Sequence, residues 1–182
     1  MTAGAYRAGV LRLTTARVTD ADPGQDLSQV EDDSSWLAVD VPGDLHLALA
    51  DAGRIPVPDF GLNNDECRWV EERSWWYRLR VPARPGPQRL VCHGLDTVAT
   101  LYLDGRLLGT SRNMFRPAVF DLEPADHERV LSIRFDPPGE DAAVVRKAAY
   151  SWGWDFAPRR PAVGVWRPVE LVSTARPIVT GV

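Results

Sequence analysis

Residues 74–109 read SWWYRLRVPARPGPQRLVCHGLDTVATLYLDGRLLG, and this stretch decides the fold. In SWWYRLRV (74–81) every second side chain from Trp75 onward is apolar or aromatic, which predicts a β-strand with one apolar face and one mixed face. Asp104-Gly105 is the usual sequence of a type I′ turn between two hairpin strands. The stretch therefore predicts antiparallel strands joined by tight turns.

The same pattern extends to both sides of this stretch. Strands are predicted at residues 7–19, 89–93, 97–104, 106–109, 131–135 and 165–172. Strands about ten residues apart with turn signals between them favour a β-sandwich or jelly roll. We expect an all-β jelly-roll β-sandwich with one short helix, capped by Asp44 and ended by Gly53.

Length and composition fit one globular domain of 182 residues, 45% hydrophobic and 25% charged. A net charge of −4 argues against nucleic acid as a partner. Arginines interrupt every apolar run at the N-terminus, and no run reaches the roughly 20 residues of a membrane span. These features predict a soluble, cytoplasmic protein without a membrane partner. Cys67 and Cys92 are expected to be free thiols, although one disulfide stays possible.

Domain boundaries follow from the same reading. Residues 1–35 are expected to hold N-terminal strands and an acidic loop (20–35) that belong to the sandwich, and residues 36–175 its main part. Residues 176–182, which include the strand-like Pro177-Ile178-Val179-Thr180, are expected to begin a linker or a further domain.

No catalytic or metal site is predicted within this chain. Glycoside hydrolysis needs two facing carboxyl groups, and the adjacent pairs Asp32/Asp33 and Glu71/Glu72 are expected in solvent, pointing apart. The three histidines lie in no nucleophile or metal motif, and the cysteines lack zinc-site spacing. We therefore expect no catalytic residue, no metal and no cofactor.

Recognition is suggested instead by Trp152-Gly153-Trp154-Asp155 in the segment RKAAYSWGWDFAPRRPAVGVWRP (146–168). Exposed aromatic faces pack on the C–H side of a pyranose, and a carboxylate accepts hydrogen bonds from its hydroxyls. Strand tryptophans, such as Trp75 and Trp166, are expected in the core. The loop tryptophans have an equally good structural reading, and Asp155 could simply accept a backbone N–H in a turn.

From Trp36 onward the chain resembles the N-terminal domain of family 2 glycoside hydrolases, in the β-mannosidase branch. The matching segments keep the family's order: VPGDLHLALADAGRIPVPDFGLNNDECRWVEERSWWYR (41–78), GLDTVATLYLDGRLLG (94–109), RNMFRPAVFDL (112–122), VRKAAY (145–150), GWDFAP (153–158) and GVWRPVEL (164–171). The resemblance implies a galactose-binding-like jelly roll, with the catalytic glutamates of a retaining mechanism on a TIM barrel that this chain does not include.

The loop carries the family's functional pattern, Trp-Asp-Trp-Gly-Pro, which walls the subsite for the terminal mannose. Trp154, Asp155 and Pro158 match it, whereas Phe156 replaces the second Trp and Ala157 the Gly. Phe156 loses the indole donor, and Ala157 would be strained if its φ were positive. The resemblance thus implies substrate-binding roles for Trp154, Asp155 and Phe156.

Three functions remain open from the sequence. The first is a non-catalytic domain of a β-mannosidase-like hydrolase, with a terminal β-mannoside or related sugar and the catalytic barrel as partners. The second is a free-standing carbohydrate-binding module. The third is a structural accessory domain without sugar contact. The chain alone is not expected to be active in any of them.

Overall fold

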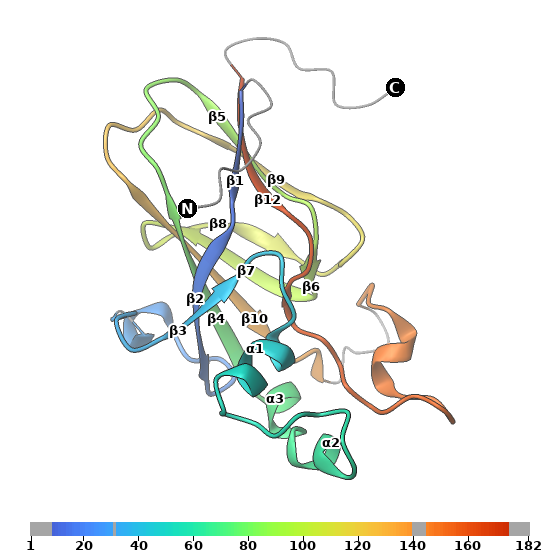
Figure 1. Ribbon diagram of the computed structural model, residues 1–182. Coiled ribbons are helices and arrows are strands. Elements are labelled where there is room, and N and C mark those ends of the chain that lie inside the picture. The colour runs from blue at the N-terminus through green and yellow to red at the C-terminus, as the bar shows by residue number, and fades with distance from the viewer. Residues whose placement is uncertain (1–8, 31, 140–144, 175–182) are drawn as a thin grey trace.

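The computed structural model describes residues 9–30, 32–139 and 145–174. Two antiparallel sheets form a β-sandwich (Figure 1). The six-stranded sheet has the order β3 (Leu37–Asp40), β2 (Thr15–Ala21), β4 (Ser74–Val81), β10 (Arg129–Asp136), β7 (Val98–Leu103), β8 (Arg106–Ser111). The four-stranded sheet has the order β1 (Val10–Leu13), β12 (Val169–Ser173), β5 (Gln88–Cys92), β9 (Ala118–Leu122). The predicted all-β jelly-roll class is confirmed.

Strand β4 shows the predicted alternation. Trp75, Tyr77, Leu79 and Val81 are buried in the main core between the sheets. Trp76 points to the opposite face and is also buried, in a second cluster with Trp36. The segment between β2 and β3 covers this second face, because Trp36 and the partly buried Leu27 and Val30 pack with Trp76.

The predicted hairpin joins β7 and β8. Asp104 and Gly105 have φ angles of 50° and 79°, as a type I′ turn requires. The Asp104 carboxylate accepts a hydrogen bond from the Val130 N–H at 2.8 Å, which ties the turn to β10.

The strand predicted at 165–172 is in fact two strands. β11 (Gly164–Val165) pairs with β6 (Leu95–Asp96), and β12 begins only at Val169. Pro168 has no N–H for a ladder, and the chain bends at Arg167, just before it. Trp166 therefore lies on neither strand and is only partly buried, with Nε1 donating to the Met114 carbonyl at 3.0 Å. The expectation that Trp166 belongs to the core was wrong.

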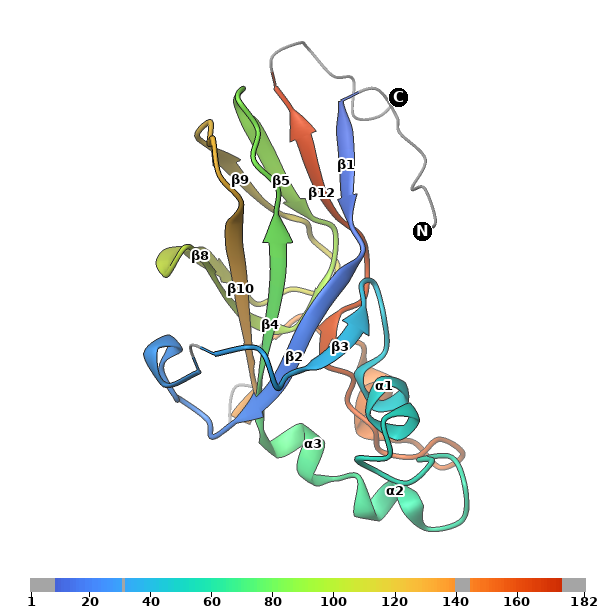
Figure 2. The ribbon, with the colours of Figure 1, turned by 60° about the vertical axis from the view of Figure 1, so that its left-hand side comes forward.

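Helices gather at one end of the sandwich (Figure 2). The predicted helix is α1 (Leu45–Asp51), whose N-cap Asp44 accepts from the Leu47 N–H at 3.1 Å. Two further short helices, α2 (Asn63–Glu66) and α3 (Trp69–Glu72), were not expected. The acidic segment 20–35 is also more regular than predicted, because β2 continues to Ala21 and a 3₁₀ turn, η1, spans Leu27–Val30.

Both cysteines are buried and free, as predicted. Burial raises the pKa of the Cys92 thiol to about 12, so this thiol is protonated and unreactive. None of the helices in the described ranges is long and apolar enough to cross a membrane. The strand-like residues 177–180 lie outside the described residues.

Candidate functional site

The candidate site is a long loop between β10 and β11 that lies beside the helical end of the sandwich (Figures 1 and 2). Its base is closed by Lys147, whose Nζ donates to Asp96 Oδ1 at 2.6 Å and to the Ala162 carbonyl at 2.5 Å. The two charged side chains are only 4% and 3% exposed. Burial lowers the pKa of Lys147, and the neighbouring Asp96 carboxylate opposes this shift. The buried ion pair fastens the loop to β6, and the hydrogen bond to Ala162 joins the beginning of the loop to its end.

The tip of the loop is a tight turn. After a 3₁₀ turn, η3 (Ala149–Trp152), Gly153 adopts φ 89° and ψ 160°, a conformation nearly restricted to glycine. Trp154 and Ala157 then exchange backbone hydrogen bonds of 3.0 and 3.1 Å. Asp155 and Phe156 consequently occupy the apex of the turn.

The side chains at this apex face solvent. Trp154 and Phe156 are 61% and 80% exposed, and the Trp154 ring lies 5.7 Å from that of Tyr150, centroid to centroid. Asp155 is exposed, and the described part of the chain gives its carboxylate no hydrogen-bond partner. The alternative role of Asp155, accepting a backbone N–H in a turn, is therefore not seen among these residues.

The structure brings Trp154, Asp155 and Phe156 together but separates Trp152 from them. Trp152 is partly buried, and the Arg159 guanidinium lies 4.9 Å from its ring centroid. Ala157 is not among the described residues with positive φ, so it carries no strain of this kind. Gly153 supplies the unusual conformation instead.

The part of the loop that follows the turn, called here its far limb (residues 158–163), is fastened to the helical end of the sandwich. Arg159 Nε donates to Glu71 Oε1 on α3 at 3.0 Å, and the Arg159 carbonyl accepts from Asn64 Nδ2 at 3.0 Å. Arg160 pairs with Asp59 at 2.7 Å. The sequence did not indicate the Glu71–Arg159 pair, because its members are 88 residues apart.

The acidic pairs differ from expectation. Glu71 is 14% exposed and Asp33 is 15% exposed, and each binds an arginine, Arg159 and Arg80 respectively. The prediction that they lie in solvent was wrong for these two members. In each pair one carboxylate is held by an arginine and the other is exposed, so neither pair presents two free carboxylates to a substrate.

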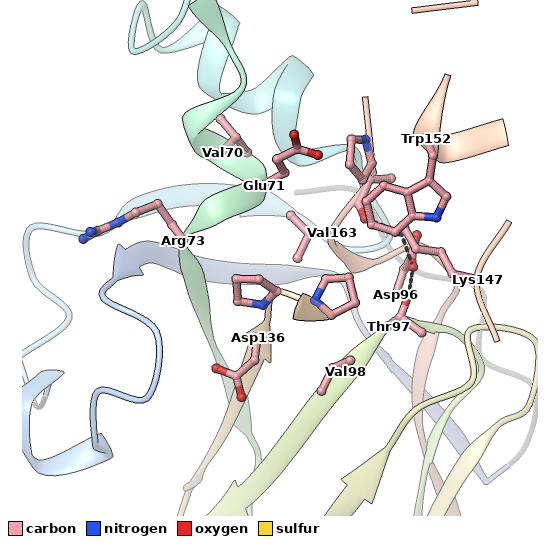
Figure 3. Close-up of a pocket in the computed structure, with 14 residues that line it drawn as sticks. Val70, Glu71, Arg73, Asp96, Thr97, Val98, Asp136, Lys147, Trp152 and Val163 are labelled. Carbon is pink, nitrogen blue, oxygen red and sulfur yellow. Dashed lines mark hydrogen bonds and ion pairs between the residues drawn. The ribbon is translucent and has the colours of Figure 1, made fainter. Parts of the chain in front are cut away.

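A small cavity lies under the loop (Figure 3). Trp152 lies over Lys147 and Asp96, and Glu71 enters from α3. The cavity shares Lys147 and Trp152 with an open depression that Glu72 and Arg159 also line, and its volume is about 30 Å³. It is far too small for a sugar, because ligand pockets usually measure hundreds of cubic ångströms. Neither hollow is lined by Trp154, Asp155 or Phe156, which project outward.

Metal binding has no support in the described ranges, where no three His, Cys, Asp or Glu side chains form a group that could hold an ion. His46, on α1, is buried, and burial is the main cause that lowers its pKa, so it is neutral near pH 7. The groups that the site exposes are the Asp155 carboxylate and the aromatic rings of its two sequence neighbours, Trp154 and Phe156.

Comparison with known proteins assigns this architecture to a family. The model for the glycosyl hydrolase 2 galactose-binding domain-like family matches residues 26–167. The chain therefore belongs to the galactose-binding-like, N-terminal domains of family 2 glycoside hydrolases, as its sequence motifs indicated. Its relatives in that family include β-mannosidases.

Two such relatives are the β-mannosidase B proteins of Emericella nidulans and Aspergillus terreus. They are 36% identical over 166 residues and 34% identical over 185 residues, covering 75% and 84% of this chain. The chain spans about a fifth of the length of each, 20% and 22%.

Solved structures agree with this placement. The β-D-mannosidase of Dictyoglomus thermophilum superposes with a TM-score of 0.76 at 28% identity, over 90% of this chain and 22% of that one. The exo-chitosanase of Amycolatopsis orientalis gives a TM-score of 0.64 at 17% identity, over 91% and 21%, which shows the shared fold alone.

Proposed function

We propose that this chain is the N-terminal, non-catalytic domain of a β-mannosidase-like retaining glycoside hydrolase. Its turn at Trp154-Asp155-Phe156 supplies part of the subsite for the terminal sugar. The observation that carries this proposal is the turn itself, in which Asp155, without a partner among the described residues, is flanked in sequence by two exposed aromatic residues on an anchored loop. The β-mannosidase relatives, at 34–36% identity, support the substrate class.

The turn suits recognition of a sugar rather than its cleavage. The Asp155 carboxylate can accept hydrogen bonds from two neighbouring hydroxyls, and the faces of Trp154 and Phe156 can pack on the C–H faces of the ring. The acid/base and nucleophile glutamates belong to the barrel domain that the family resemblance implies. The turn adds binding and orientation to that chemistry.

The partner of this domain is the catalytic domain of the same enzyme. Large apolar side chains are exposed on the helical end, beside the turn: Leu47 (54%), Val57 (61%), Phe60 (75%) and Leu62 (81%). Large exposed apolar side chains concentrated in one part of the fold favour a docking surface. Docking there would place the turn at the domain boundary, where an active-site cleft would receive it.

The test is Asp155→Ala in the complete enzyme of which we propose this domain is part. We expect kcat/KM for an aryl β-mannoside to fall at least about tenfold, or about 1.4 kcal/mol, because hydroxyl contacts in the transition state are lost. Thermal stability should not change, since the Asp155 side chain has no partner among the described residues.

The matched control is Asp126→Ala, because Asp126 is also an exposed carboxylate in a polar turn. It should leave kcat/KM unchanged. If Asp155→Ala also leaves the kinetics unchanged, the turn is not part of the subsite. If it lowers the melting temperature and nothing else, the structural role is correct instead.

A further inference from the structure

We infer that Arg159 is a positioning residue that holds the sugar-contacting turn in place, acting from outside the subsite. This inference rests on the proposed function. Arg159 makes two contacts at once: its guanidinium covers the Trp152 ring at 4.9 Å, and its Nε donates to Glu71 on α3 at 3.0 Å. It thereby links the part of the loop that precedes the turn, its near limb (residues 147–153), to the helical end of the sandwich.

The backbone around Arg159 is as closely fitted as its side chain. A Cβ added at Gly153 would lie 3.2–3.3 Å from the Arg159 N, Cα and Cβ atoms, so the two limbs of the loop touch here. The Arg160 N–H donates to the Ser151 carbonyl at 3.1 Å and closes the loop at the next position. The turn that carries Asp155 begins directly beyond this crossing.

Charge and shape explain why an arginine stands at this point. Glu71 is 14% exposed, and its Oε2 is buried without a hydrogen-bond partner among the described residues. The guanidinium compensates this buried carboxylate, whose charge would otherwise be costly. Its flat, delocalised cation can stack on an indole while donating from its edge, which a lysine cannot do equally well.

Loss of Arg159 should therefore release Trp152 and leave the Glu71 charge uncompensated. Both effects loosen the far limb of the loop, whereas the Lys147–Asp96 ion pair at the base of the loop stays intact. A displacement of about 1 Å in a substrate-positioning group can lower a rate up to about a hundredfold, so the turn is sensitive to such loosening.

The kinetic test is a double-mutant cycle in the complete enzyme, with Arg159→Ala, Asp155→Ala and the double variant. We expect Arg159→Ala to lower kcat/KM about fivefold or more, but less than about twofold in the Asp155→Ala background. A merely structural loss would act equally in both backgrounds. The matched control is Arg89→Ala, which removes a surface Arg–Asp pair at 2.7 Å on the four-stranded sheet and should leave kcat/KM unchanged.

Hydrogen exchange tests the same inference without catalysis. In the 182-residue chain, Arg159→Ala should speed exchange of the Trp154 and Ala157 amides, which bond each other across the turn, while amides of β4 stay protected. Unchanged exchange at these two amides would overturn the inference, as would equal kinetic effects in both backgrounds. If exchange speeds up but Asp155→Ala leaves kcat/KM unchanged, Arg159 holds the turn and the proposed sugar contact fails.

Discussion

At the scale of single residues, Trp75 and Trp76 show how adjacent, identical side chains take different roles. They are 1% and 0% exposed and point to opposite faces of β4. Trp75 Nε1 donates to the Val70 carbonyl of α3 at 2.8 Å. Trp76 Nε1 is buried without a partner among the described residues. One indole thus joins sheet to helix, and the other contributes its apolar area and its ring.

This difference predicts unequal costs for the same substitution. Trp75→Phe leaves the buried Val70 carbonyl without its donor and should lower the free energy of unfolding by about 1 kcal/mol more than Trp76→Phe does. Each variant serves as the other's control for lost ring volume. Urea unfolding followed by circular dichroism measures both. Equal losses would mean that the hydrogen bond contributes nothing.

At the scale of elements, Glu170 joins three neighbouring strands of the four-stranded sheet. From β12 it accepts from Arg12 of β1 at 2.9 Å and bonds His93, just after β5, at 2.9 Å. Burial works to raise the pKa of Glu170, but the bonds to Arg12 and His93 outweigh it and hold this pKa below its ordinary value. The ionised carboxylate is thus favoured in the folded state.

The sign of the resulting pH dependence is fixed by that direction. A pKa lowered by folding adds stability above the unfolded value, about 4.3 for a glutamate, and this contribution is lost as the pH falls through the folded pKa. Glu170→Gln should therefore be less stable than the parent near pH 7, by up to about 1 kcal/mol because Arg12 is exposed. The difference should shrink below about pH 4 in denaturant titrations. A difference that is constant with pH would contradict this account.

At the scale of the whole molecule, large exposed apolar side chains occur on two different parts of the surface. The helical end exposes Phe60 and Leu62 beside the candidate turn, whereas Leu107 is exposed on the edge strand β8 of the six-stranded sheet. We expect the catalytic domain to cover only the helical end.

Hydroxyl-radical labelling of the complete enzyme can test this, because Leu62 and Leu107 are a matched pair. In this domain Leu62 is 81% exposed and Leu107 is 63% exposed. Docking predicts that Leu62 is nevertheless labelled more slowly than Leu107. Faster labelling of Leu62 would show that the catalytic domain does not cover this face.

Much of the fold could be predicted from local patterns. The alternation in SWWYRLRV, the Asp104-Gly105 turn and the Asp44 cap each act over a few residues, so the sequence shows them directly. The short strands β3 and β9 were missed, as were helices α2 and α3. Each has only four or five residues, too few to show a clear period.

The candidate turn was predictable in composition but not in its support. The sequence by itself determined the sheet-forming alternation, the turn residues and the motif that contains Trp154, Asp155 and Phe156, because these depend on neighbours in the chain. Only the tertiary structure decided that Trp152 turns inward, that Glu71 is largely covered and that Arg159 joins them. Those outcomes depend on side chains far apart in sequence, such as Glu71 and Arg159, which meet only after the sandwich has folded.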